Sequence, residues 1–277
     1  MIRLLIFTLT ILAVPLFAID QLPEISDSTA LQIGNKIWKN ECNGTINGLT
    51  SWNSGENFAS LGINHFIWYP ATEKKVFDES FPKLLLFLQQ NGVFLPLWLQ
   101  KSPPCPWPNQ ELFLKAVKNP EDEKMGELKE VLKNTIALQA RFSILRLQNA
   151  LPLMLEKTDE KNRASVTARF YLLAKIPAGL FALIDYVNFK GEGTKETERY
   201  QNQGWGLLQV LEKMKDSDRN GALFQFSHAA EIVLTQRVKN SPPERKEERW
   251  LPGWINRVRS YLNYNITRES RNQESFG

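Results

Sequence analysis

Apolar residues recur at helical spacing along most of the chain, and one early stretch departs from that pattern. Apolar side chains between Leu31 and Trp38 fall on one face of a helix predicted over Thr29–Glu41. The Ser-Asp-Ser sequence at 26–28 supplies side chains that cap a helix start. The pattern therefore predicts a core-packed helix with the carboxylate of Glu41 in its last turn.

The stretch that follows, residues 43–70, has the pattern of a small sheet. Asn-Gly pairs at 43–44 and 47–48 favour tight turns. Two short β-prone runs, LTSW and FASLGINHFIWY, are separated by the turn-like sequence Asn53-Ser54-Gly55. We predict two or three short strands here, since no other part of the chain carries so clear a strand pattern.

Helical patterns return from Asp78 onward. FPKLLLFLQQ ends at Asn91-Gly92, which is a plausible helix end. A long helical run over 121–157 is expected to bend near Pro152, and another over 160–186 to kink or break at Pro177. Three more helices precede a polar tail at about 265–277. We expect residues 19–277 to form a single α+β domain that is predominantly α-helical.

The first 18 residues, MIRLLIFTLTILAVPLFA, have the pattern of a secretory signal peptide. One arginine precedes an apolar run, and Ala18 stands at the expected cleavage point. The alternative, an uncleaved membrane anchor, needs about 20 apolar residues, and this run is shorter. The sequence predicts a periplasmic or secreted protein with no stable membrane insertion after cleavage.

The composition of the chain excludes fewer functions than its N-terminal pattern does. The formal net charge is +4 and is spread along the chain, which suits an anionic polymer but is equally explained by solubility. Because a signal peptide is predicted and the charge is diffuse, a nucleic acid is the least favoured partner. The two cysteines, Cys42 and Cys105, form either a disulfide or two buried thiols. With two histidines and no ligand spacing, no metal or other cofactor is expected.

Three segments, in order, resemble the lysozyme superfamily, especially phage-type endolysins. Glu41 at a helix end is followed by SLGINHF, in which Gly62, Ile63 and His65 match a glycine-isoleucine-glycine-histidine turn. ALIDYVNFKGEG with WGLLQVLEKM is similar to the central helix and its glycine-rich turn, and RVKNSPPERKEERWLPGWINRVRSYL resembles the closing segment. The resemblance implies a lysozyme-like fold with residues 70–160 as a helical insertion.

A second resemblance concerns Glu192. The sequence EGTKETERYQNQGWGLLQ is similar to the lytic transglycosylase signature, where a catalytic glutamate precedes a glycine-leucine-methionine-glutamine motif. Only about 85 residues follow Glu192, fewer than that family's usual order needs. We therefore expect Glu41 to be the principal acid, with Glu192 and Gln209 near the same cleft.

Glycosidic cleavage needs a protonated acid, and ordinary hydrolysis needs a second carboxylate. Glu56 is the first candidate for the second carboxylate and Glu192 the next. The endolysin pattern has an aspartate where this chain has Thr50, which has no charge but can position a water. If no second carboxylate reaches the site, the one-acid transglycosylase mechanism becomes the better expectation.

Several polar and aromatic residues are candidates for binding sugar rings. For His65, a structural role in the turn competes with substrate contact. For the others, packing in the core is the alternative. The candidate substrate-binding residues are Thr50, Trp52, His65, Tyr200, Gln203 and Gln209.

The sequence thus predicts a monomeric, exported enzyme that cleaves peptidoglycan β-1,4 bonds, a muramidase or a lytic transglycosylase. The cell-wall substrate is implied by the resemblance together with export. Two alternatives stay open: an inactive cell-wall-binding or scaffold protein on the same fold, and a hydrolase of another polysaccharide such as chitosan.

Overall fold

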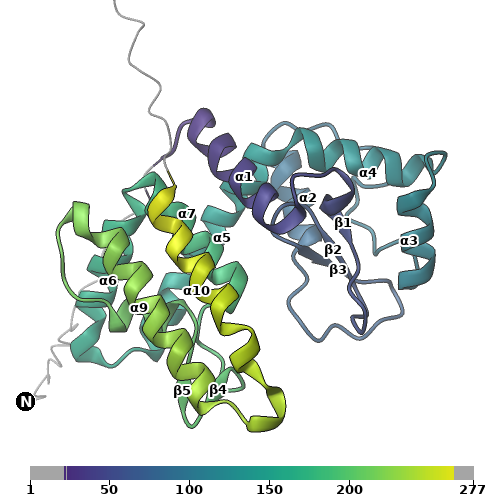
Figure 1. Ribbon diagram of the computed structural model, residues 1–277. Helices are drawn as coiled ribbons and strands as arrows, with labels where there is room; N and C mark the ends of the chain where they lie inside the picture. Colours follow the sequence, from purple (N-terminus) through teal and green to yellow (C-terminus); the bar gives the residue numbers. More distant parts are fainter. Residues whose placement is uncertain (1–21, 23, 265–277) are drawn as a thin grey trace, which may run out of the picture.

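The computed structural model describes Leu22 and residues 24–264. Most of these residues are helical, and the strands are short and antiparallel. Two groups of elements lie on either side of a long helix, α5 (Ile136–Lys157), as Figure 1 shows. A single cluster of buried apolar side chains includes residues from both groups. The predominantly helical α+β class is therefore confirmed.

Helix α1 (Asp27–Cys42) agrees closely with its sequence pattern. The hydroxyl of Ser26 accepts a hydrogen bond from the backbone N–H of Thr29 at 3.1 Å, which caps the helix start. Ile33 and Ile37 are buried on its inner face. Asn43 ends the helix in the left-handed conformation with φ 53°. The helix places Glu41 in its last turn, as predicted.

The predicted N-terminal sheet is present and has three strands in the order β1-β2-β3. A 3₁₀ turn, η1 (Asn47–Leu49), precedes it. Two side chains of the third strand, Phe66 and Trp68, are fully buried and anchor the sheet in the core. The strands are β1 (Thr50–Ser51), β2 (Ala59–Leu61) and β3 (Phe66–Trp68), all antiparallel.

The N-terminal sheet belongs to the first of the two groups of elements. The helices of this first group are α2 (Phe81–Gln90), α3 (Gln110–Lys118) and α4 (Glu123–Asn134). The expected end of α2 at Asn91 is confirmed. The continuous helix predicted over 121–157 is wrong, because α4 and α5 are separate helices that meet at Thr135. The Thr135 hydroxyl donates to the carbonyl of Val131 at 2.7 Å, and the amide of Gln139 donates to that of Leu132 at 2.6 Å. These side chains satisfy carbonyls at the end of α4, and Pro152 lies within α5.

Helices α1 and α5 pack closely because of one glycine. A Cβ added at Gly34 would lie 2.7 Å from the side chain of Ile136 and 2.8 Å from its carbonyl oxygen. Arg141 of α5 also donates to the carboxylate of Asp27 at 2.7 Å. The segment 70–160 therefore contributes α5, the helix that lies between the two groups.

The second group begins where Pro177 separates two helices, as predicted. Helices α6 (Glu160–Ala174) and α7 (Pro177–Lys190) meet at 117°. A two-stranded hairpin that the sequence pattern did not predict follows α7. The remaining elements are β4 (Arg199–Tyr200), β5 (Gln203–Gly204), α8 (Leu207–Lys213), α9 (Arg219–Asn240), η2 (Pro243–Arg245), η3 (Glu247–Arg249), α10 (Leu251–Ser260) and η4 (Tyr261–Asn263).

The proposed signal peptide and the polar tail lie outside the described residues. Within the described part, no single helix is long and apolar enough to cross a bilayer. Of the described helices, only α6 and α7 together pass that test of length and composition, and they do so as a bent pair. Residues 179–186 of α7 are buried in the protein.

The turn after β2 offers a test of how the sheet is held against α5. Gly62 has φ +68°, and a Cβ there would lie 2.4 Å from Oε1 of Gln139, which accepts the N–H of Ile63 at 3.0 Å. We expect Gly62→Ala to lower the free energy of unfolding by about 2–4 kcal/mol, because left-handed strain and loss of this contact add. Chemical denaturation measures the loss.

Gly55→Ala is the matched control, since Gly55 has φ +86° but nothing within 4 Å of the added Cβ. It should lose only the strain energy, about 1–2 kcal/mol. Equal losses in the two variants would mean that the contact with Gln139 contributes nothing.

Candidate functional site

The carboxylate of Glu41 is bound by an arginine of the C-terminal helix. Glu41 and Asp185 of α7 both accept hydrogen bonds from the guanidinium of Arg257, those of Asp185 at 2.8 and 2.9 Å. The hydroxyl of Tyr261 donates to Asp185 at 2.6 Å. These four residues, which we call the Arg257 cluster, connect α1, α7 and the C-terminal helix.

The Arg257 cluster is buried and charged. The side chain of Asp185 has no exposed surface, and that of Glu41 is 14% exposed. Burial lowers the pKa of Arg257, but the hydrogen bonds and charge of Asp185 and the charge of Glu41 outweigh it and raise this pKa above its ordinary value. Arg257 therefore remains a cation, and Glu41 has a permanent positive partner.

The end of α7 adjoins this cluster. The guanidinium of Arg257 lies 4.4 Å from the ring centre of Phe189, and the ammonium of Lys190 lies 3.4 Å from that of Trp254. Burial, together with the charges of Arg237 and Arg257, lowers the pKa of Lys190 to about 7, against the opposing charge of Glu247. The last turn of α7 is thus surrounded by aromatic rings and positive charge.

Glu192 follows directly, between two glycines that both have positive φ, 82° at Gly191 and 83° at Gly193. The carbonyls of Gly191 and Glu192 each accept a backbone N–H from the start of α8 at 3.0 Å. A Cβ at Gly193 would lie 2.2 Å from Oε1 of Gln209, so only glycine fits this approach. The backbone around Glu192 is therefore held firmly against α8.

The side chain of Glu192 is differently placed from that of Glu41. It is partly exposed, and among the described residues it has no ion pair or hydrogen-bonded partner. Its charge acts on Arg146 of α5. Surrounding protein lowers the pKa of Arg146, and the charges of Glu192 and Asp78 oppose this. The side chain of Arg146 is exposed on α5.

The candidates in the N-terminal sheet are mostly engaged within that sheet. Thr50 is buried and donates to the carbonyl of Asn47 at 3.1 Å. Trp52 is 5% exposed and donates from its indole to the carbonyl of Glu56 at 2.8 Å. Glu56 lies in the loop between β1 and β2, whereas Glu41 adjoins the other end of these strands, where Cys42 contacts Gly62. His65 is partly exposed in the turn, with φ 50°. The structure does not bring Glu56 to Glu41.

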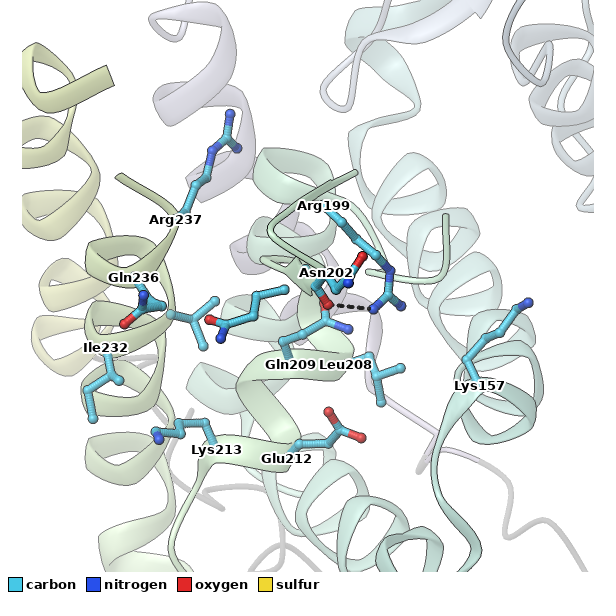
Figure 2. A pocket seen from close by; sticks show the side chains of 13 residues that line it. Lys157, Arg199, Asn202, Leu208, Gln209, Glu212, Lys213, Ile232, Gln236 and Arg237 are labelled. Atoms are coloured by element: carbon cyan, nitrogen blue, oxygen red, sulfur yellow. Dashed lines mark hydrogen bonds between the residues drawn. The ribbon is translucent and has the colours of Figure 1, made fainter. Parts of the chain in front are cut away.

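The candidates from the second group lie around the β4–β5 hairpin. The hydroxyl of Tyr200 donates to Glu247 at 3.0 Å, and Arg237 binds the same carboxylate through two 2.8 Å bonds. Gln209 accepts the N–H of Gly206 at 2.9 Å and donates to the carbonyl of Gly193 at 3.1 Å. Gln203 and Gln209 both line a pocket of about 500 Å³ beside the hairpin (Figure 2).

Both cysteines are free and buried. Burial and the charge of Glu41 raise the pKa of the Cys42 thiol to about 12. Burial also raises the pKa of Cys105 to about 12, despite an opposing hydrogen bond with the backbone of Trp107. Of the two possibilities left by the sequence, the structure has the two buried thiols. Over the described residues, no three His, Cys, Asp or Glu side chains group as metal ligands.

Comparisons with protein-family models, with curated proteins and with solved structures find no match for this chain. The site must therefore be interpreted from its own geometry.

Sequence reasoning did not single out Asp185, Arg146 or Lys190. Arg257 was likewise not a candidate, and the structure shows it bonded to two carboxylates. Asp185 had one signal, since it is the single charge in the apolar run AGLFALIDYV and a buried charge requires a partner. Nothing in the sequence identifies that partner, which lies 72 residues further along the chain.

Replacing Arg257 by an uncharged residue should show how much the unpaired charge of the buried Asp185 destabilises the fold. We expect Arg257→Met to lower the free energy of unfolding by about 3–5 kcal/mol, because it leaves Asp185 buried with only Tyr261 as partner. Thermal and urea unfolding measure it. Arg259→Met is the control, since Arg259 pairs with Glu231 at the surface, and it should change stability little. Similar losses in the two variants would contradict the importance of the Arg257 cluster.

Lys190 should make stability depend on pH. Its pKa falls from an ordinary 10.5 to about 7 on folding. Between these values the unfolded chain binds more protons, so the stability of the wild type rises with pH in this window. We expect its stability relative to Lys190→Met to increase from about pH 7 to 10.5, as followed by urea unfolding. The control variant Lys239→Met changes an exposed lysine and should give no such trend. A stability difference between the wild type and Lys190→Met that does not change with pH would contradict the lowered pKa of Lys190.

Proposed function

We propose that this protein is an exported enzyme that cleaves the glycan strands of peptidoglycan, with Glu192 as the proton donor. The substrate and the export follow from the sequence resemblance and the signal-like residues 1–18. The choice of Glu192 follows from the bonding of the two candidate acids.

The observation that carries the proposal is the compact unit formed by α7, Glu192, the β4–β5 hairpin and α8. A carboxylate follows the end of a buried helix, and a short hairpin and a second helix enclose its backbone. Gln209, the last residue of the transglycosylase-like motif, hydrogen-bonds to the carbonyl of Gly193, next to Glu192. The two ends of the transglycosylase-like motif are therefore in contact through the backbone beside Glu192.

The bonding of Glu41 supports this choice. A general acid must carry a proton and release it to the leaving oxygen. Glu41 instead accepts a hydrogen bond from Arg257, so its carboxylate is engaged by a charged donor of α10. Glu192 has no such partner among the described residues. We therefore assign the proton transfer to Glu192 and a structural role to Glu41.

The mechanism that fits best uses one acid. Glu56 belongs to the N-terminal sheet, in the loop between β1 and β2. The carboxylate that lies near Gly191, that of Glu198, is paired with Lys195. We therefore assign the reaction to Glu192 alone. Glu192 would protonate the leaving glycosidic oxygen, and its carboxylate would then accept the proton of the sugar hydroxyl that closes the ring. No water enters the reaction, so this is lytic transglycosylation.

Arg146 is the group that would meet the developing charge. Its side chain is exposed on α5, and its pKa responds to the charge of Glu192. Its positive charge would attract the carboxylate that remains after the proton leaves. Arg146 is thus a positioning residue for Glu192.

Zymography on purified cell wall tests the assignment of the acid. We expect Glu192→Gln to lower lytic activity at least about 100-fold, because the amide cannot donate the catalytic proton. Product analysis should find ring-closed sugar ends and no water-derived reducing ends. Circular dichroism of each variant checks that it is folded.

Glu41→Gln is the matched variant, since it makes the same change at the other candidate. It should retain substantial activity while losing stability through the Arg257 cluster. Loss of activity in a folded Glu41→Gln protein, with Glu192→Gln active, would return the acid to Glu41. A wild type that binds cell wall without cleaving it would favour the scaffold alternative.

A further inference from the structure

The loop that follows α2 exposes two large apolar side chains to solvent. In the sequence VFLPLWL, residues 93–99, which we call the apolar loop, Phe94 is 100% exposed and Leu97 is 85% exposed. Leu95 and Leu99 of the same loop are buried and fix it to the core. A single exposed apolar side chain needs no explanation, but two on one short, anchored loop mark a contact surface.

Three successive carbonyls of the apolar loop have partners inside the protein. The carbonyl of Leu95 accepts a hydrogen bond from the side-chain amide of Gln100 at 2.9 Å. The carbonyls of Pro96 and Leu97 accept the backbone N–H groups of Leu99 and Gln100 at 2.8 and 3.4 Å. Water cannot bond to carbonyls inside a lipid layer, so a segment that enters lipid needs internal partners of this kind. The bonding of the backbone therefore suits a lipid environment.

Polar and charged groups adjoin the apolar loop at Trp98. The indole N–H of Trp98 donates to the carboxylate of Glu127 at 2.6 Å, and the ammonium of Lys124 lies 5.7 Å from the ring centre of Trp98. Lys101, just beyond the loop, is exposed. A tryptophan with a bonded N–H beside lysines is the combination that proteins place at the level of lipid head groups.

Area and shape favour a lipid surface over a protein partner. A fully exposed phenylalanine presents about 200 Å² of apolar surface, and Phe94 and Leu97 together offer less than the roughly 800 Å² that a stable protein interface buries on each partner. A lipid layer accepts a protruding side chain without a matching cavity. A second copy of the chain would meet the apolar loop poorly at the pocket beside the β4–β5 hairpin, because polar and charged side chains line most of that pocket.

We propose that the apolar loop docks the protein on the surface of a phospholipid bilayer. Phe94 and Leu97 enter the boundary of the acyl chains, and Trp98 lies at the head groups. The contact is peripheral, since only the loop enters the lipid. It does not involve Glu192, so it is independent of the cleavage proposed above.

Vesicle binding by the full chain tests the proposal. With vesicles of phosphatidylethanolamine and phosphatidylglycerol, we expect Phe94→Ala to weaken binding about tenfold and Leu97→Ala about fivefold, because each removes apolar surface that leaves water on binding. Urea unfolding should show little change in Phe94→Ala, since this side chain is fully exposed. Phe224→Ala is the matched control, because it makes the same change at a half-exposed position on α9 and should leave vesicle binding unchanged.

A fluorescent label reports which side chain enters the lipid. Cys42 and Cys105 are buried, and burial raises the pKa of each thiol to about 12, so a thiol reagent at neutral pH should react with a newly introduced exposed cysteine. An environment-sensitive dye attached to Phe94→Cys should shift its emission to the blue when vesicles are added. The same dye on Phe224→Cys should not shift.

Three outcomes would overturn the proposal. The first is a wild type that does not bind vesicles. The second is equal binding by the wild type, Phe94→Ala and Leu97→Ala, which would assign the lipid contact to another segment, such as the apolar run in residues 1–18. The third is a wild-type dimer in sedimentation velocity that Phe94→Ala dissociates, which would make a second copy the partner of the loop.

Discussion

The Arg257 cluster is the interaction on which the arrangement of the molecule depends. Asp185 lies in a helix that is otherwise buried and apolar, and its charge can be accommodated there only with a partner. Arg257 supplies two hydrogen bonds and Tyr261 a third. Because Arg257 also bonds to Glu41, the same cation fixes the C-terminal helix against both α7 and α1. Among the described elements, the last α-helix, α10, is thereby joined to the first, α1.

This connection also explains why the two carboxylates at helix ends differ. Glu41 is in the last turn of α1, within reach of α10, and its charge completes the buried cluster. Glu192 is two residues beyond the end of α7, where two glycines carry the backbone away from the cluster and toward α8. The carboxylate of Glu41 is bound within the Arg257 cluster. The side chain of Glu192 is partly exposed, and its charge acts on Arg146.

Local signals in the sequence predicted much of the fold. Ser26 caps α1, Asn91 ends α2, Pro177 separates α6 from α7, and the strand pattern after Asn53 is a real sheet. The β4–β5 hairpin escaped prediction because each strand has only two residues, too few for an alternating pattern. The break at Thr135 escaped because it contains neither proline nor glycine, and it depends on side chains that bond to backbone carbonyls.

The candidate site was harder to predict than the fold, and for a physical reason. Whether a glutamate is free or paired depends on contacts far along the chain, and Arg257 is 216 residues from Glu41. Spacing and composition carry no trace of that bond. The motif around Glu192 was visible in the sequence. Whether Glu192 or Glu41 is the better candidate for the proton donor could be judged only once the bonded partners of both carboxylates were known. A glutamate at a helix end is therefore a weak indication of a proton donor. A glutamate at a helix end whose carboxylate is not paired with a cation is a stronger one.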